Sequence, residues 1–168
     1  MGKSLNMDGK KLMVLVMVTT IIVICLLVAI NQNRTQQTIS SERKSALEGL
    51  EVAIRHVNEK VLYDPDGVVL GRSQQIIDTI PVTLLNGKLR ANSQSLENGL
   101  AIAYKALQTE HSAFDNWIII ELPTNNDNAR KVKLKHHVTP TDCHLIYTEA
   151  GTEDKAAAPI YQTVNAGC

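Results

Sequence analysis

The side chains best suited to catalysis or metal binding in this chain are its five histidines. They stand at His56, His111, His136, His137 and His144. The sequence has neither the H-E-x-x-H spacing of a zinc-binding helix nor a Cys/His ligand set. His136 and His137 would point to opposite faces of one strand, so they could not hold one metal ion together. We therefore expect structural or solvated histidines, and we do not expect an enzyme.

Other chemical motifs point the same way. Asp64, Asp66 and Gly67 match part of a calcium-loop pattern, but no glutamate completes it, and a turn explains these residues. Neither a Gly-rich phosphate loop nor a nucleophile elbow occurs. The 17 basic and 17 acidic residues cancel, so no charge field would gather nucleic acid. We expect no cofactor, no metal, no nucleic acid and no small-molecule substrate.

The cysteines fall into two groups. Cys25 lies inside an apolar run, where a thiol behaves as a small hydrophobic side chain. Cys143 and Cys168 both fall in the part of the chain expected outside the cytoplasm, and we predict that they pair. Two free thiols, or a reactive Cys143 near a helix N-terminus, are the alternatives.

An uncharged apolar run extends from Leu12 to Ile30 and is expected to anchor the rest of the chain to a membrane. As a helix it would be about 28 Å long, close to the thickness of a bilayer core. Lysines precede the run and only Arg34 closely follows it, which places residues 1–11 in the cytoplasm and the rest outside. A removable signal peptide is the alternative, although the run is long for one and lacks a small-x-small exit.

Residues 31–62 are expected to continue this helix as an amphipathic one. Neither proline nor an early glycine interrupts them, and apolar residues recur at spacings of three and four. This stripe consists of Ala46, Leu50, Ile54, Val57 and Val61, with Ala53 beside it. We expect it to pack on the chain's own head, residues 63–168; a coiled-coil seam with a second copy is the alternative. Residues 31–37 could instead form a loose polar stalk.

The first part of the head has mixed signals. Val68 to Leu70 is a short candidate strand, and Ile76 to Leu85 is an extended apolar stretch that Pro81 interrupts. Asn86-Gly87 is a strong turn signal. Residues 96–107 have helical spacing, although Gly99 and a local alternation also permit a strand. We favour the helix.

In the second part of the head, the sequence predicts a hairpin, a helix and a final strand. Trp117 to Leu122 is a strand, and Val132, Leu134, His136 and Val138 share one face of the next strand. Thr139-Pro140-Thr141-Asp142 has the cap, proline and carboxylate of a helix start, and Gly151 would close that helix. Ile160 to Val164 is the last strand. A Cys143–Cys168 bridge would then pin a helix to it.

Together these features resemble a type IV pilin or pseudopilin: a short positive N-terminus, one spanning helix that runs on as an amphipathic helix, an α+β head and C-terminal cysteines. The closing segment is similar to that of type IVb pilins, including those of conjugative thin pili. It comprises Val138 to Leu145, then Gly151, then Ile160 to Cys168. The resemblance implies a long helix packed on a small antiparallel sheet.

The resemblance also implies partners and a place. The head would lie in the periplasm or in an extracellular pilus, and the helix in the inner membrane would pack against other pilin subunits or assembly proteins. The helix residues expected to make these contacts in the membrane are Leu12, Val14, Val16, Ile21, Ile24 and Leu27.

The N-terminus departs from the pilin pattern. Prepilins are cleaved after a glycine that a hydrophobic residue follows, and they carry glutamate at the fifth mature position. If Gly9 is that glycine, Lys10 comes next and Val14 stands at the fifth position; Gly2 fits no better. A minor, initiating or tip subunit therefore fits better than a major one. A membrane-tethered periplasmic binding or sensing domain, which needs neither feature, is the alternative function.

Overall fold

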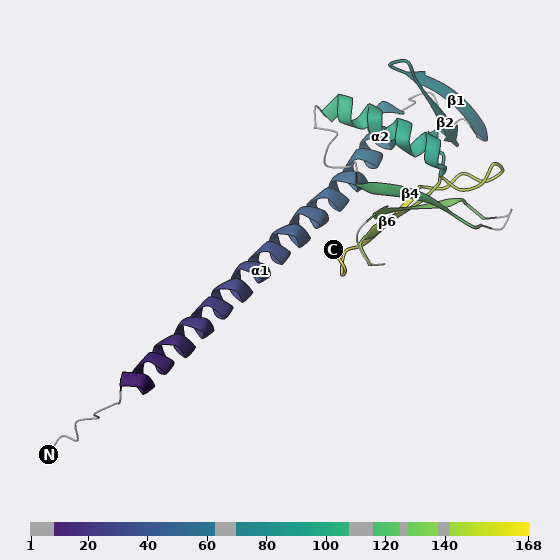
Figure 1. Ribbon diagram of the computed structural model, residues 1–168. Coiled ribbons are helices and arrows are strands. Elements are labelled where there is room, and N and C mark those ends of the chain that lie inside the picture. Colours follow the sequence, from purple (N-terminus) through teal and green to yellow (C-terminus); the bar gives the residue numbers. More distant parts are fainter. Residues whose placement is uncertain (1–8, 63–69, 108–115, 125–127, 138–141) are drawn as a thin grey trace. The chain divides into compact units, whose positions relative to one another are not determined.

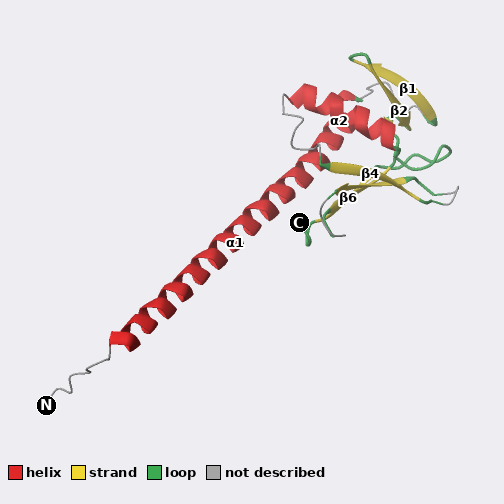
Figure 2. Cartoon of the chain, in the orientation of Figure 1, coloured by secondary structure: helices red, strands yellow, loops and turns green. Residues whose placement is uncertain are grey.

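The computed structural model describes residues 9–62, 70–107, 116–124, 128–137 and 142–168. Across these residues the protein is α+β, with helices and strands in separate segments of the chain (Figure 2). Its strands are antiparallel, as expected, but they form two sheets, not the single sheet that the resemblance implied. The chain divides into two compact units, Met1–Ser40 and Ser41–Cys168. From here on, the head means this second unit, which begins at Ser41 and not at residue 63 as the sequence suggested.

Helix α1 (Gly9–His56) is continuous (Figure 1). Neither glycine nor proline occurs between Lys10 and Glu48, so no residue with poor helix propensity breaks it. The expected continuity is confirmed, and residues 31–37 are helical, which contradicts the loose stalk. At Val57 the chain changes to a π-helix, η1 (Val57–Val61), where the Leu62 N–H donates to the Val57 carbonyl over 2.9 Å. The predicted turn at residues 63–67 lies outside the described residues.

The first sheet has the order β1-β2-β3, formed by β1 (Arg72–Ile77), β2 (Ile80–Leu85) and β3 (Lys88–Leu89). The single extended stretch predicted for residues 76–85 was wrong, because the chain reverses at Asp78 and Thr79. Both have positive φ, 50° and 73°, as in a tight two-residue hairpin turn. Such turns favour pairs that contain glycine, so an Asp-Thr pair does not indicate one in the sequence. The Asn86-Gly87 turn is confirmed. Leu70 is not in a strand, and residues 68–69 are not described.

Helix α2 (Ser93–Leu107) confirms the favoured helical prediction. Asn92 caps it, since its Oδ1 accepts the Ser95 N–H over 2.7 Å. Gly99 had left a strand possible, but in the helix it allows close packing: a Cβ there would come within 2.7 Å of Leu89 Cδ1. The Ser95 hydroxyl donates to the Thr83 carbonyl and accepts the Thr83 N–H, which ties α2 to β2.

The second sheet has the order β4-β5-β6-β7 with every neighbouring pair antiparallel. Its strands are β4 (Trp117–Leu122), β5 (Lys131–His136), β6 (His144–Thr148) and β7 (Ile160–Val164). The predicted hairpin of β4 with β5 and the predicted final strand are confirmed, whereas Val138 lies outside the described residues. In the sequence, α2 lies between the strands of the first sheet and those of the second.

The helix predicted from Thr139 to Gly151 was wrong, since β6 occupies that segment. Residues 144–148 alternate between faces and include aromatic and β-branched side chains, which suit a strand. In the sheet, Leu145 pairs with Leu134 and Tyr147 pairs with Val132, and all four side chains are fully buried. This burial outweighs a local capping signal, most of which lies outside the described residues.

One hydrophobic cluster joins the elements of the head. It contains Leu50 and Ile54 of α1, Leu89 of β3, Leu96 of α2 and Leu134 of β5, all without exposed surface. The C-terminal end of α1 is therefore part of the core. The side chains are mainly aliphatic, as the composition of the chain requires.

Two buried polar side chains connect the parts of the head. Asn86 donates to the carbonyls of Ala150 and Thr152 over 2.6 and 2.9 Å, so the β2–β3 turn is joined to the β6–β7 connection. Glu149 accepts the N–H groups of Ala91 and Arg130 over 3.1 and 2.9 Å. Because buried polar groups are costly without partners, these bonds favour one arrangement of the two sheets.

Candidate functional site

The first part of α1 presents apolar side chains in every direction. From Met13 to Ile30, each large apolar side chain is 47 to 62 % exposed, including those of Val14, Val16, Ile21, Ile24 and Leu27. The helix is long and apolar enough to cross a membrane. An apolar surface of this extent is unfavourable in water and suits lipid or the apolar helices of a partner. The side chains of Lys10 and Leu12 are not described, and Gly9 is the first residue of α1.

Hydroxyl groups in and beside this apolar segment are satisfied within the helix. Thr19 donates to the Val16 carbonyl over 2.9 Å, and Thr20 donates to the same oxygen. Thr35 donates to the Asn31 carbonyl over 3.0 Å. A hydroxyl bonded to its own helix needs no water, so these threonines are compatible with an apolar surrounding.

The second part of α1 places the predicted stripe in the head. Leu50, Ile54 and Val57 are fully buried and Ala53 is 1 % exposed, whereas Ala46 is only partly buried. Leu47, which is not part of the predicted stripe, is also fully buried. The side chain of Val61 is not described.

A buried amide that the sequence analysis missed extends this stripe. Asn58 in η1 has no exposed surface; its Oδ1 accepts the Leu89 N–H over 2.8 Å, and its Nδ2 donates to the Tyr161 hydroxyl over 2.8 Å. The Tyr147 hydroxyl donates to the Leu89 carbonyl over 2.6 Å. Burial raises the pKa of both tyrosines, so both remain protonated. One side chain thus connects the end of the long helix to both sheets.

Strand β7 is attached to α1 by charged and polar contacts. Glu51 accepts hydrogen bonds from Arg55 Nε, over 2.9 Å, and from the Thr163 hydroxyl. The Arg55 guanidinium lies 4.0 Å from the centre of the Tyr161 ring, a cation–π geometry. Burial alone would raise the pKa of Glu51, but the Thr163 and Arg55 hydrogen bonds and the Arg55 charge outweigh it and lower that pKa.

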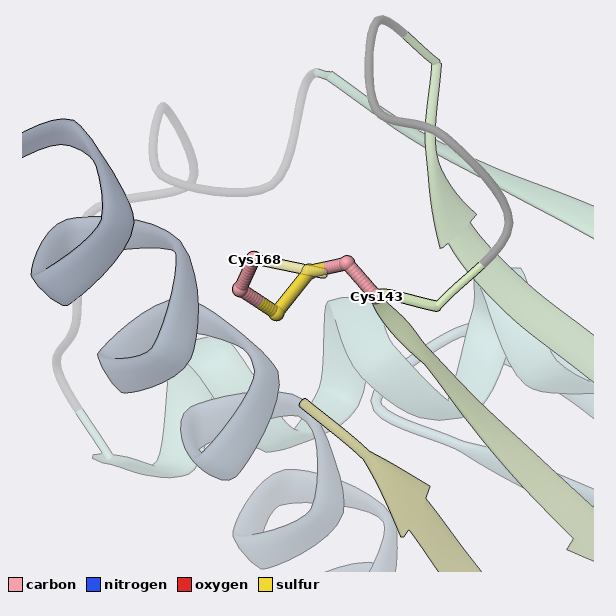
Figure 3. The surroundings of a disulfide bond; sticks show 2 residues. All are labelled: Cys143 and Cys168. Carbon is pink, nitrogen blue, oxygen red and sulfur yellow. A yellow bond between two sulfur atoms is a disulfide. The ribbon is translucent and has the colours of Figure 1, made fainter. Parts of the chain in front are cut away.

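The predicted disulfide is present between Cys143 and Cys168, whose Cα atoms are 4.8 Å apart (Figure 3). It joins the start of β6 to the residues after β7, two neighbouring strands that pair His144 with Val164. The expected bridge from a helix to a strand was therefore wrong. The Gly167 N–H donates to the Asp142 carbonyl over 3.0 Å and holds the same end closed. The bridge thus fixes the C-terminal residue to the sheet.

Three of the histidines lie in or beside the second sheet. The rings of His136 and His137 stack with centroids 5.3 Å apart, so the expected opposite orientation was wrong: β5 ends at His136, and the alternation ends with it. Burial and the positive charges of Arg43 and His137 lower the pKa of His136. His144 is 8 % exposed, and His111 lies outside the described residues. The described residues contain no group of three or more potential metal-binding side chains.

No protein-family model, no curated protein and no solved structure matches this chain.

Proposed function

We propose that this protein is a pilin-like structural subunit of a type IV pilus, a conjugative thin pilus or a related secretion pseudopilus. One observation carries the proposal. A single continuous helix is apolar and exposed from Met13 to Ile30, while its other end forms part of the core of a small α+β head. The helix of such a subunit can lie in a bilayer before assembly and pack against the helices of other subunits afterwards.

The disulfide supports a location for the head. Disulfides persist in oxidising compartments, and the bacterial periplasm is one of them. With the lysine-rich N-terminus in the cytoplasm, the helix would cross the inner membrane once and the head would lie in the periplasm or in the extracellular pilus. The partners would be other pilin subunits or assembly proteins, together with the lipid bilayer.

The uncharged helix surface supports a minor, initiating or tip role. Every described side chain from Met13 to Ile30 is uncharged, and Val14 stands where a filament-forming pilin carries glutamate. A subunit at one end of a filament has fewer neighbours, so it does not need that carboxylate to pair with the next amino terminus.

Mass spectrometry of the mature protein tests pilin processing. Loss of the first nine residues, with a methylated amino terminus at Lys10, is the result expected for a processed pilin. An intact Met1 favours a membrane-tethered periplasmic binding or sensing domain. The Gly9-Lys10 sequence favours this second candidate, since a tethered domain has no use for a cleavage site.

Cysteine crosslinking tests assembly. Cys25 is free and exposed on the apolar helix, so it reports contact between helices without further engineering. Oxidation of membranes that contain the other pilus components should give covalent products with a second subunit, and the Cys25→Ser variant should give none. A monomer alone in every membrane extract contradicts the proposal. Engineered cysteines at Ile21 and Ile24 then show which face of the helix makes the contact.

A further inference from the structure

An open cleft of about 690 Å³ lies in the head, lined by residues from both sheets. Its volume is in the range of small-molecule sites. Its basic side chains are Arg72 at the start of β1, Arg90 after β3, and Arg130 with Lys131 at the start of β5. These residues are far apart in the sequence and come from both sheets, so the packing of the two sheets within the head brings them together.

Arg90 is the least exposed of these four basic residues. Its Nε atom is buried and makes no hydrogen bond within the described part of the chain. Burial and the positive charges of Arg130 and Arg72 lower the pKa of Arg90, although Glu149 and Glu153 partly offset them. A buried donor next to two like charges is unfavourable, and an anion in the cleft would relieve both conditions.

The cleft also contains four acidic residues, Glu121, Glu149, Glu153 and Asp154, and the first three already have partners. Glu149 uses both oxygens to accept backbone N–H groups. Glu121 accepts the Ser93 N–H over 2.8 Å, and Glu153 forms a salt bridge with Arg72. Among the described residues, by contrast, Arg90 and Arg130 have no ion pair. Two guanidinium groups thus remain for a ligand.

We propose that this cleft binds a small hydroxylated ligand through an oxyanion group, a carboxylate or a phosphate, with Arg90 and Arg130 as its donors. Guanidinium groups bind both oxyanions through paired, charge-assisted hydrogen bonds. Three other lining residues, Thr124, Asn128 and Thr152, have polar side chains that can bind hydroxyl groups. The site is independent of the pilin proposal, because it involves neither the apolar helix nor a second subunit.

Calorimetric titration of the full chain in detergent micelles tests this site with three matched probes. Glucose 6-phosphate and glucuronate carry a phosphate and a carboxylate on the same type of ring, and glucose carries neither. At constant ionic strength we expect one or both charged probes to bind and glucose not to bind. The charged probe that binds more tightly shows whether the site prefers a phosphate or a carboxylate. Failure of both charged probes, or equal binding of glucose, overturns the proposal.

Two variants test the donors. Arg90→Gln should weaken binding of the charged probe roughly 10- to 100-fold, the loss expected for charge-assisted hydrogen bonds. Arg130 is exposed, so Arg130→Gln should weaken binding while the melting temperature stays unchanged, which keeps the test valid if Arg90→Gln does not fold. Arg34→Gln, on the exposed surface of α1, is the matched control. Unchanged affinity in Arg130→Gln and in folded Arg90→Gln contradicts the proposal.

Discussion

The two parts of α1 share one helical backbone and have opposite environments. Between Met13 and Ile30, large apolar side chains expose about half of their surface or more, whereas Leu47, Leu50, Ile54 and Val57 expose none. The first part has no polar face, and the second has one apolar stripe with charged residues beside it. A helical period of apolar residues therefore occurs where only one face of the helix is buried. A helix that is apolar all round needs an apolar surrounding.

The largest expected effect comes from placing the same charge in each part. Leu50→Asp buries an unpaired carboxylate in the core and should destabilise the head by more than about 4 kcal/mol. Leu26→Asp should leave the unfolding of the head unchanged. If the segment spans a bilayer, Leu26→Asp should instead make the free energy of membrane insertion less favourable by about 2.5 to 3.5 kcal/mol.

Chemical denaturation of both variants in micelles, together with carbonate extraction from membranes, measures the two effects. Equal destabilisation of the head by both substitutions would remove the distinction between the two parts of α1. Leu26→Ala is the matched control, since it changes the size of the side chain without adding a charge.

Loss of the disulfide should have the next largest effect. Its cysteines are 25 residues apart, and closing such a loop stabilises a fold by about 3 kcal/mol in the chain-entropy model. The Cys143→Ser, Cys168→Ser double variant should lose about that much free energy of unfolding. Cys25→Ser should lose none, because Cys25 is free. Equal stability of the double variant and the wild type would show that the strands alone hold the C-terminus.

The buried amide at the end of the helix should contribute less. Asn58→Ala leaves the Leu89 N–H without its acceptor, which should cost about 1 to 3 kcal/mol. Asn98→Ala removes an amide at the surface of α2 that donates to the Pro81 carbonyl, and it should cost less than about 1 kcal/mol. Denaturant melts of both variants measure the difference. A larger loss in Asn98→Ala would mean that Asn58 does not hold the elements together.

The smallest expected effect is a pH dependence at Glu51. Its pKa is lowered in the folded protein, so its ionised form stabilises the fold above the unfolded pKa of about 4.5, and this contribution disappears as the pH falls through the folded pKa. Glu51→Gln should therefore be less stable than wild type at pH 6, by about 0.5 kcal/mol or less, and this difference should decrease as the pH falls below 4.5. Melts across this pH range, with Glu48→Gln as an exposed control, measure it. A constant difference at every pH would contradict the assignment.

Elements with strong local patterns were predictable. The apolar run and the periodic stripe predicted α1, and β-branched and aromatic residues between turn signals predicted β4, β5 and β7. The expected compartment and number of the cysteines predicted the disulfide. Only the strand pairing showed which two elements the disulfide joins.

Other features depend on contacts between distant residues. β6 follows a sequence with a clear helix-start signal, and its strand conformation results from pairing with β5 and β7. The Asp78-Thr79 turn divides a stretch that is otherwise mainly apolar. Asn58 resembles any surface residue of an amphipathic helix until the structure shows Leu89 and Tyr161 beside it.

Only the structure settled that the helix is unbroken through residues 31–37. The sequence by itself determined that the first part of the helix requires an apolar surrounding and that its second part needs one partner surface. These properties follow from the order of side chains along a single helix. The tertiary structure decided which polar groups are buried, how the strands divide into two sheets and that Arg72, Arg90 and Arg130 line one cleft. Those properties depend on pairings between residues far apart in the chain, which no local periodicity encodes.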